Sequence, residues 1–160
     1  RTPAEMRSCV DTLLECAQDV ILVDYFFEPN EHKWLRPLRE FLQCLAGRDN
    51  DLPVNRVELH TQERAEAGFF KRHCEMTLAR VVPRDLPFKV VRWKAHPDLH
   101  NRYVLTNRGG IAFQHGLDDG DGTDDVTLLP SKTYFNRWRQ FQRASSPFVY
   151  VDEYPVRGIA

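Results

Sequence analysis

The sequence lacks an apolar run long enough to cross a bilayer. Its longest apolar stretch, Val20–Val23 with its neighbours, is far shorter than the roughly 20 residues that a membrane-spanning helix needs. The opening residues Arg1–Glu5 also lack the apolar segment of a signal peptide, and the chain does not begin with methionine. We therefore predict a cytoplasmic protein without a transmembrane segment, whose sequence is a fragment of a longer chain.

Cysteine pairs are missing as well. The cysteines form no CxxC motif and are widely spaced: Cys9, Cys16, Cys44 and Cys74. Most of them fall on apolar faces of expected helices, which is typical of buried thiols in a reducing compartment. His73 beside Cys74 has no further ligands at zinc-site spacing, and the acidic segment 118–125 lacks the closing glutamate of an EF-hand. We predict buried thiols, no metal and no cofactor.

An excess of positive charge is the third absence. Lys and Arg contribute 22 charges and Asp and Glu 23, so the formal net charge is −1. A protein that coats nucleic acid without sequence preference carries a large positive excess, which this composition excludes. Recognition of phosphate by this protein must therefore depend on a local cluster of residues.

What is present is the composition of an ordinary globular domain. Of its 160 residues, 42% are hydrophobic and 28% are charged, and no internal repeat is found. A chain of this length buries enough surface to fold without a disulfide framework. We therefore expect residues 1–160 to form a single domain.

Hydrophobic periodicity predicts helices and strands in alternation over the first two-thirds of the chain, and neighbouring strands after that. The expected helices cover 2–17, a segment from Trp34 to a stop at Gly47, 62–82 and 131–141. The expected strands cover 19–27, 54–60, 88–93, 103–106, 111–113 and 148–151. A tight hairpin is expected at 107–110, because Asn and Gly tolerate positive φ. These elements fit an α/β fold, a mixed β-sheet with helices packed on its faces.

The densest cluster of reactive side chains lies between His100 and Asp118. If the segment 101–106 is a strand, its alternation puts His100, Arg102 and Val104 on one face. A guanidinium holds phosphate oxygens with two parallel hydrogen bonds, and a neighbouring imidazole attacks phosphorus or accepts a hydrogen bond. The pair therefore predicts chemistry directed at phosphate esters.

This segment resembles the motif of the phospholipase D superfamily, in which His, any residue, Lys, four residues and Asp precede a Gly-rich stretch. The corresponding residues are His100, Arg102, Asn107, Gly109 and Gly110. The segment is more similar still to the phospholipase D-like domain that follows MIT domains in eukaryotic membrane-remodelling proteins. In that domain a Gly-Leu-Asp sequence follows the His-x-Arg strand, as Gly116-Leu117-Asp118 does here. Segment 21–45 also resembles the start of that domain.

The resemblance implies a phospholipase D-like fold and a metal-independent phosphodiesterase, more similar to a nuclease than to a lipase because no apolar membrane-docking segment is evident. His100 would be the nucleophile, His100 of the partner subunit the general acid, and Arg102 the phosphate clamp in a homodimer. Such a module would serve as the effector of a larger defence or DNA-processing protein. The further ligand contacts expected are Asn107, Arg108, His115, Asp118, Asp24 and Lys94. Asp24 or Asp118 would orient the imidazole.

Two alternatives remain open at this point. Relatives with His-x-Arg bind rather than cleave, which implies a catalytically inactive module that binds phosphate or phosphoinositide groups, recruits partners and binds lipid peripherally. In the second alternative the motif is vestigial and the domain purely structural. Arg137, Arg139 and Arg143 fall on a polar side of the last expected helix, with Lys132 nearby, which is typical of hydrated surface. Alternatively, they would extend a phosphate-binding track together with Arg92, Lys94 and Arg108.

Overall fold

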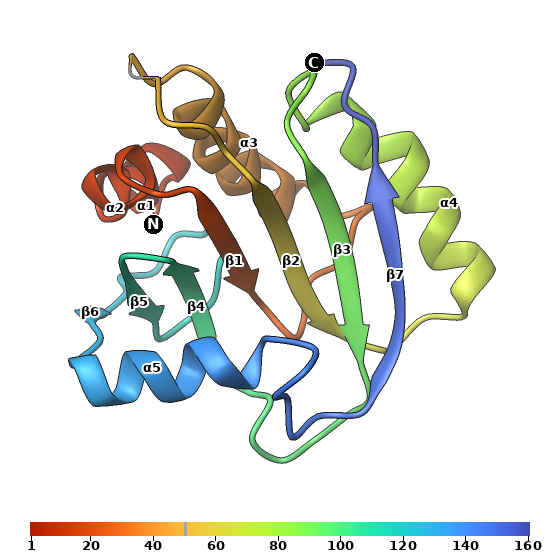
Figure 1. Ribbon diagram of the computed structural model, residues 1–160. Helices are drawn as coiled ribbons and strands as arrows, with labels where there is room; N and C mark the ends of the chain where they lie inside the picture. The colour runs from red at the N-terminus through yellow and green to blue at the C-terminus, as the bar shows by residue number, and fades with distance from the viewer. Residues whose placement is uncertain (50) are drawn as a thin grey trace.

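The computed structural model describes residues 1–49 and 51–160, which form a seven-stranded mixed sheet (Figure 1). The strands are β1 (Asp19–Val23), β2 (Arg56–Gln62), β3 (Phe88–Trp93), β4 (Arg102–Thr106), β5 (Gly109–Phe113), β6 (Val126–Leu128) and β7 (Tyr150–Val156). Their spatial order is β6-β5-β4-β1-β2-β3-β7. β1, β2 and β3 are parallel, and the strands on either side of them are antiparallel to their neighbours. The expected α/β class with a mixed sheet is confirmed.

The helices cover the two faces of the sheet unequally. They are α1 (Pro3–Ser8), α2 (Asp11–Glu15), α3 (His32–Ala46), α4 (Ala67–Thr77), the 3-10 turn Leu78–Arg80 and α5 (Ser131–Gln140). In Figure 1, α3 and α4 lie behind the sheet, whereas α5 lies in front of β4 and β5. No helix of the described residues lies in front of β2, β3 and β7. The segment after α5 covers part of that face instead, because Phe141 and Phe148 pack with Val91 and Trp93. None of these helices has both the length and the apolar composition needed to cross a membrane.

Strand alternation divides the core into two clusters, one on each face of the sheet. Val20 and Leu22 of β1 join the larger cluster beneath α1 to α4, whereas Ile21 and Val23 join the smaller cluster beneath α5. Helix α3 presents one apolar face to the larger cluster, made of Trp34, Leu35, Leu38, Phe41, Leu42 and Leu45. β1 is therefore buried on both faces, which is what its continuous apolar run predicts.

Several boundaries differ from those expected. The expected helix 2–17 is two short helices, because Val10 between them adopts a non-helical φ of −120° and ψ of −5°. The expected helix 62–82 begins only at Ala67, because β2 extends to Gln62 and the side chain of Glu66 caps the helix. β6 was not expected, and the last strand begins at Tyr150 rather than Phe148.

The β4–β5 hairpin forms at the expected place, but Asn107 stabilises it through its side chain and not through a positive φ. Among the described residues, positive φ values occur only at Asp85 and Gly116, so Asn107 does not adopt the left-handed conformation. Instead its side-chain Oδ1 accepts hydrogen bonds from the backbone N–H groups of Gln18 at 2.9 Å and Asp19 at 3.2 Å. Asn107 therefore joins the hairpin to the start of β1.

The cysteine prediction is right for two residues and wrong for two. Cys44 and Cys74 are buried, whereas Cys9 and Cys16 are exposed. Each exposed cysteine occupies the C-cap position of a short helix, Cys9 after α1 and Cys16 after α2. Because the expected single helix is broken between them, these two thiols do not share its apolar face.

Candidate functional site

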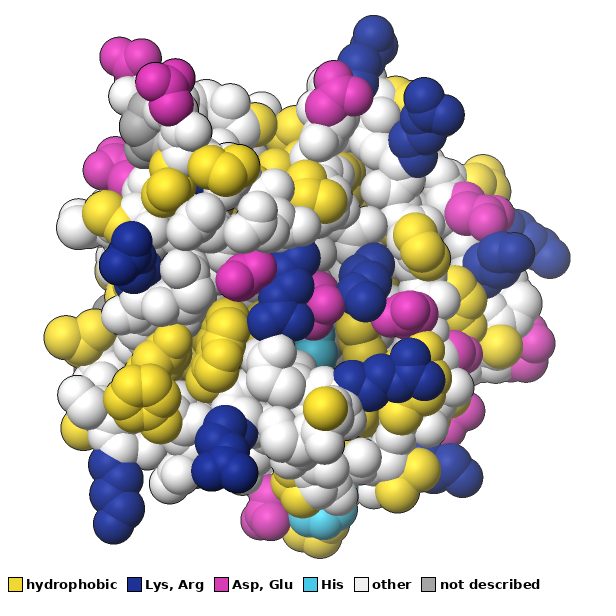
Figure 2. Space-filling view, in the orientation of Figure 1, with side chains coloured by type: hydrophobic (Ala, Val, Ile, Leu, Met, Phe, Trp, Pro, Cys, Tyr) yellow, Lys and Arg dark blue, Asp and Glu magenta, His cyan; other side chains and the backbone are white. Residues whose placement is uncertain are grey.

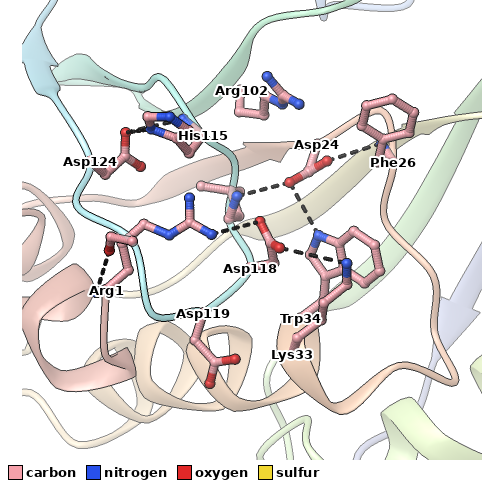
Figure 3. Close-up of polar contacts among 12 residues, drawn as sticks. Arg1, Asp24, Phe26, Lys33, Trp34, Arg102, His115, Asp118, Asp119 and Asp124 are labelled. Atoms are coloured by element: carbon pink, nitrogen blue, oxygen red, sulfur yellow. Dashed lines mark hydrogen bonds and ion pairs between the residues drawn. The ribbon is translucent and has the colours of Figure 1, made fainter.

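A polar pocket of about 510 Å³ opens at the edge of the sheet where β1 and β2 end and β4 begins. Four of the sequence-predicted site residues line it: Asp24, Arg102, His115 and Asp118. Figure 3 shows these side chains around the loop that follows β5 and the first turn of α3. The carboxyl ends of parallel strands are the usual place for ligands in α/β sheets. This pocket is the candidate functional site.

Asp24 forms the floor of the pocket. It follows directly after β1, and its side chain is only 1% exposed. One carboxylate oxygen accepts from Phe26 N at 3.0 Å, and the other accepts from Trp34 Nε1 at 3.2 Å and Leu117 N at 2.8 Å. Burial raises the pKa of Asp24, although these hydrogen bonds and the charge of Arg102 oppose the rise. Asp24 thus holds β1, α3 and the loop after β5 together.

Arg102 is the first residue of β4 and extends along the face that Val104 shares. Its Nη1 donates to the carbonyl oxygen of Gln114 at 3.2 Å, and its Cζ lies 4.8 Å from the ring centroid of Tyr25. The Nε–H group is buried and has no hydrogen-bond partner among the described residues. The guanidinium is therefore fixed in place but retains unused donor capacity.

A second guanidinium, which sequence reasoning missed, belongs to the same pocket. Arg64 follows the end of β2, and its Cζ lies 4.9 Å from the ring centroid of Phe26. The Cζ of Arg102 lies 5.6 Å from the same ring. Phe26 is 37% exposed, so both guanidinium groups lie beside the same accessible aromatic side chain. The place of Arg64 just after a parallel strand was the only signal in the sequence.

Gly116 lets the loop after β5 approach Asp24 closely. Its φ is +112°, and a Cβ atom there would lie 2.8 Å from Asp118 Oδ1 and 3.0 Å from Asp24 Oδ2. The next residue, Leu117, is buried in the larger core. The Gly-Leu-Asp sequence therefore has a structural role: it lets this loop pack directly against Asp24 and form one wall of the pocket.

Asp118 and His115 each have a partner. Asp118 forms ion pairs with Arg1 and Lys33, both at 3.7 Å. The Nδ1 atom of His115 lies 3.1 Å from Oδ1 of Asp124, which also accepts from the backbone N–H of His115 at 3.0 Å. Asp124 is a further site residue that the sequence did not single out.

His100 does not line the pocket. β4 begins at Arg102, so His100 lies in the preceding turn, outside the strand alternation that was expected to align the two side chains. Its ring is exposed and packs edge-on against Tyr25 at 5.9 Å between centroids. Tyr25 thus contacts both His100 and the Arg102 guanidinium.

The other predicted contacts lie elsewhere. Asn107 and Arg108 follow the far end of β4, roughly 13 Å along the strand from Arg102. Arg108 Nε donates to the carbonyl oxygen of Cys16 at 3.4 Å. Lys94 is exposed just after β3 and does not line the pocket.

The proposed basic track is also interrupted. Arg92 is 1% exposed and binds Asp152 through Nε at 2.8 Å and Nη2 at 2.7 Å. A buried arginine with this bidentate partner does not present its guanidinium to a ligand, so a continuous track through Arg92 is wrong.

Fold and site together define an α/β protein with an arginine-bearing pocket at the carboxyl edge of its parallel strands. Comparisons with protein-family models and with curated proteins find no match to this chain.

Proposed function

We propose that this protein binds the phosphate group of a phosphate ester between Arg102 and Arg64. The observation that carries the proposal is the pair of guanidinium groups at Phe26, with Cζ-to-centroid distances of 5.6 and 4.9 Å. Two like charges at one partly exposed ring repel each other, and an anion that contacts both would relieve the repulsion. Phosphate is the anion whose oxygens best match two guanidinium forks.

Acidic side chains in the same pocket limit what else the ligand contains. Glu28 and Glu31, near the start of α3, also line the pocket. Burial raises the pKa of Glu28, and the charge of Arg64 opposes this. Carboxylates accept hydrogen bonds from hydroxyl or amino groups and repel a second phosphate. A volume of about 510 Å³ suits a small molecule or the end of a longer one, so we expect an ester with a single phosphate and a polar remainder.

The test is calorimetric titration of the protein with inorganic phosphate, glycerol phosphate and a short single-stranded DNA. Arg102→Ala and Arg64→Ala should each weaken binding at least about 10-fold, in line with the loss of a charge-assisted hydrogen bond. Arg108→Ala is the matched control, because Arg108 is an arginine at the other end of the same strand. Equal affinities for wild type, Arg102→Ala and Arg108→Ala would refute the proposal.

A second candidate is the homodimeric phosphodiesterase, with His100 as the nucleophile and Arg102 as the clamp. It is favoured by the ring of Tyr25, which packs against exposed His100 on its edge and lies near the Arg102 guanidinium. Analytical ultracentrifugation tests it together with a His100→Ala variant. A monomer that does not form a dimer on addition of a phosphodiester would exclude this candidate.

A further inference from the structure

We infer that His115 is the acid–base residue for hydrolysis of the phosphate ester bound at Arg102, and that a single chain suffices for it. This inference rests on the proposed phosphate site and extends it from binding to turnover. Of the described histidines, His115 alone lines the pocket with Arg102 and Asp24. Figure 3 shows its imidazole on the side of Asp124 that faces Arg102.

Asp124 fixes the ring of His115. Its side chain is 5% exposed, and its Oδ1 accepts from both the Nδ1 and the backbone N–H of His115 at 3.1 and 3.0 Å. Oδ2 of Asp124 is buried and has no partner among the described residues, so the hydrogen bonds of this carboxylate go to His115. A hydrogen bond from Nδ1–H to a carboxylate leaves Nε2 as the acceptor in the neutral ring.

The ring is also accessible. The side chain of His115 is 54% exposed, whereas the aspartate that holds it is buried. A buried carboxylate behind an exposed imidazole is the arrangement in which the carboxylate orients the ring and stabilises its protonated form. His100 has no carboxylate hydrogen-bonded to it in the described part of the chain.

Nε2 of His115 accepts a proton from a water molecule as the water oxygen bonds to phosphorus, and the bond from phosphorus to the leaving oxygen breaks. The imidazolium then returns the proton to the leaving alkoxide, so that one water is consumed and an alcohol and a phosphate are released. Arg102 and Arg64 stabilise the negative charge on the non-bridging oxygens. Asp124 acts through His115 and is a positioning residue.

The experiment measures release of para-nitrophenolate from bis(para-nitrophenyl) phosphate and para-nitrophenyl phosphate, with EDTA present to suppress contaminating hydrolases. The wild type should turn over at least one of the two, and His115→Ala should lose about 10²-fold or more in kcat. Asp124→Asn should lower kcat at least about 10-fold with KM unchanged. Added imidazole should restore part of the activity of His115→Gly, which a merely structural histidine would not show.

The controls separate this inference from the proposed binding site. His96→Ala is the matched variant, since His96 also has an aspartate neighbour, Asp98 at 3.9 Å, but lies outside the pocket. It should keep wild-type kcat. Phosphate binding measured by calorimetry should survive in His115→Ala and Asp124→Asn, which also shows that these variants fold. Phosphate binding without turnover of either ester by the wild type would overturn the inference and leave the binding site intact. Loss of turnover in His100→Ala with full activity in His115→Ala would overturn it as well.

Discussion

The indole N–H of Trp93 donates a hydrogen bond to Nδ1 of His60 at 3.0 Å. Because Nδ1 accepts this proton, the ring proton of a neutral His60 is on Nε2, which donates to Glu58 at 2.8 Å. A small cavity of about 190 Å³ lies over this chain of hydrogen bonds, with Arg56 and Lys89 at its rim. Figure 2 shows basic and acidic side chains gathered around a partly visible histidine on this face.

Acidification should destabilise the fold through His60. Burial lowers the pKa of His60, although the hydrogen bond and charge of Glu58 oppose the change. The folded protein therefore takes up this proton less readily than the unfolded chain. The contribution of His60 to stability is fully present above its pKa in the unfolded chain, about 6.5. It is lost as the pH falls toward the lower pKa of His60 in the folded protein.

The measurement is the free energy of unfolding in urea at pH 7 and pH 5. The wild type should lose more stability over this interval than His60→Gln, which does not titrate. Burial raises the pKa of Asp24, which acts in the opposite direction, but this contribution is common to both proteins and cancels in the difference. If the free energy of unfolding changed equally with pH in the wild type and in His60→Gln, this account of His60 would be contradicted.

Asn107→Ala should destabilise the protein and leave phosphate binding unchanged. Its Oδ1 accepts from two backbone N–H groups, those of Gln18 and Asp19, and each lost hydrogen bond costs about 1 kcal/mol. We expect a loss of about 1–2 kcal/mol in urea unfolding. Asn107→Asp retains an oxygen acceptor and should therefore keep most of the stability that Asn107→Ala loses. A variant of full stability that no longer binds phosphate would instead place Asn107 in the binding site.

Gly116→Ala should damage both stability and the pocket. The added Cβ would lie 2.8 Å from Asp118 Oδ1, and the φ of +112° is strained for alanine. We expect a loss of about 1–3 kcal/mol, measured by thermal unfolding, together with weaker phosphate binding. Gly122→Ala is the control, because a Cβ there meets no atom within 4 Å. Similar melting temperatures for the two variants would show that the close approach of Gly116 to Asp24 is unimportant.

Thiol labelling should divide the cysteines into two classes. Cys9 and Cys16 are exposed and should react with a disulfide reagent in the native protein. Cys44 and Cys74 should react only on unfolding, since burial raises the pKa of both thiols, that of Cys74 to about 12. Fast reaction of all four thiols under native conditions would contradict the packing of α3 and α4.

The sequence predicts the centre of the fold better than its periphery. The run Val20–Val23 and the apolar face of α3 define the central strand and the helix behind it, because burial dictates both patterns. The break at Val10 is not marked by proline or glycine, and β6 has only three residues, too few for its alternation to indicate a strand. These elements depend on contacts with α3 and β5, which local sequence does not encode.

The site was predicted in part for the same reason. Arg102, Asp24 and Asp118 line the pocket. The resemblance also placed Asn107 in the site, but Arg102 and Asn107 lie at opposite ends of β4. His100 precedes the strand by a turn that the alternation did not anticipate. Arg64 comes to Arg102 from the loop after β2, and Asp124 lies nine residues beyond His115 in the same loop between β5 and β6. Only the folded conformation brings each of these pairs together.

The most direct test of the phosphate site follows the Nε–Hε signals of arginines in ¹H–¹⁵N NMR spectra during titration with inorganic phosphate, with Arg102→Ala and Arg108→Ala used for assignment. The unpartnered Nε–H of Arg102 should shift progressively to saturation, whereas the signal of Arg108 should stay in place. An Arg102 signal that does not move, or equal small shifts of both arginines without saturation, would contradict the central claim.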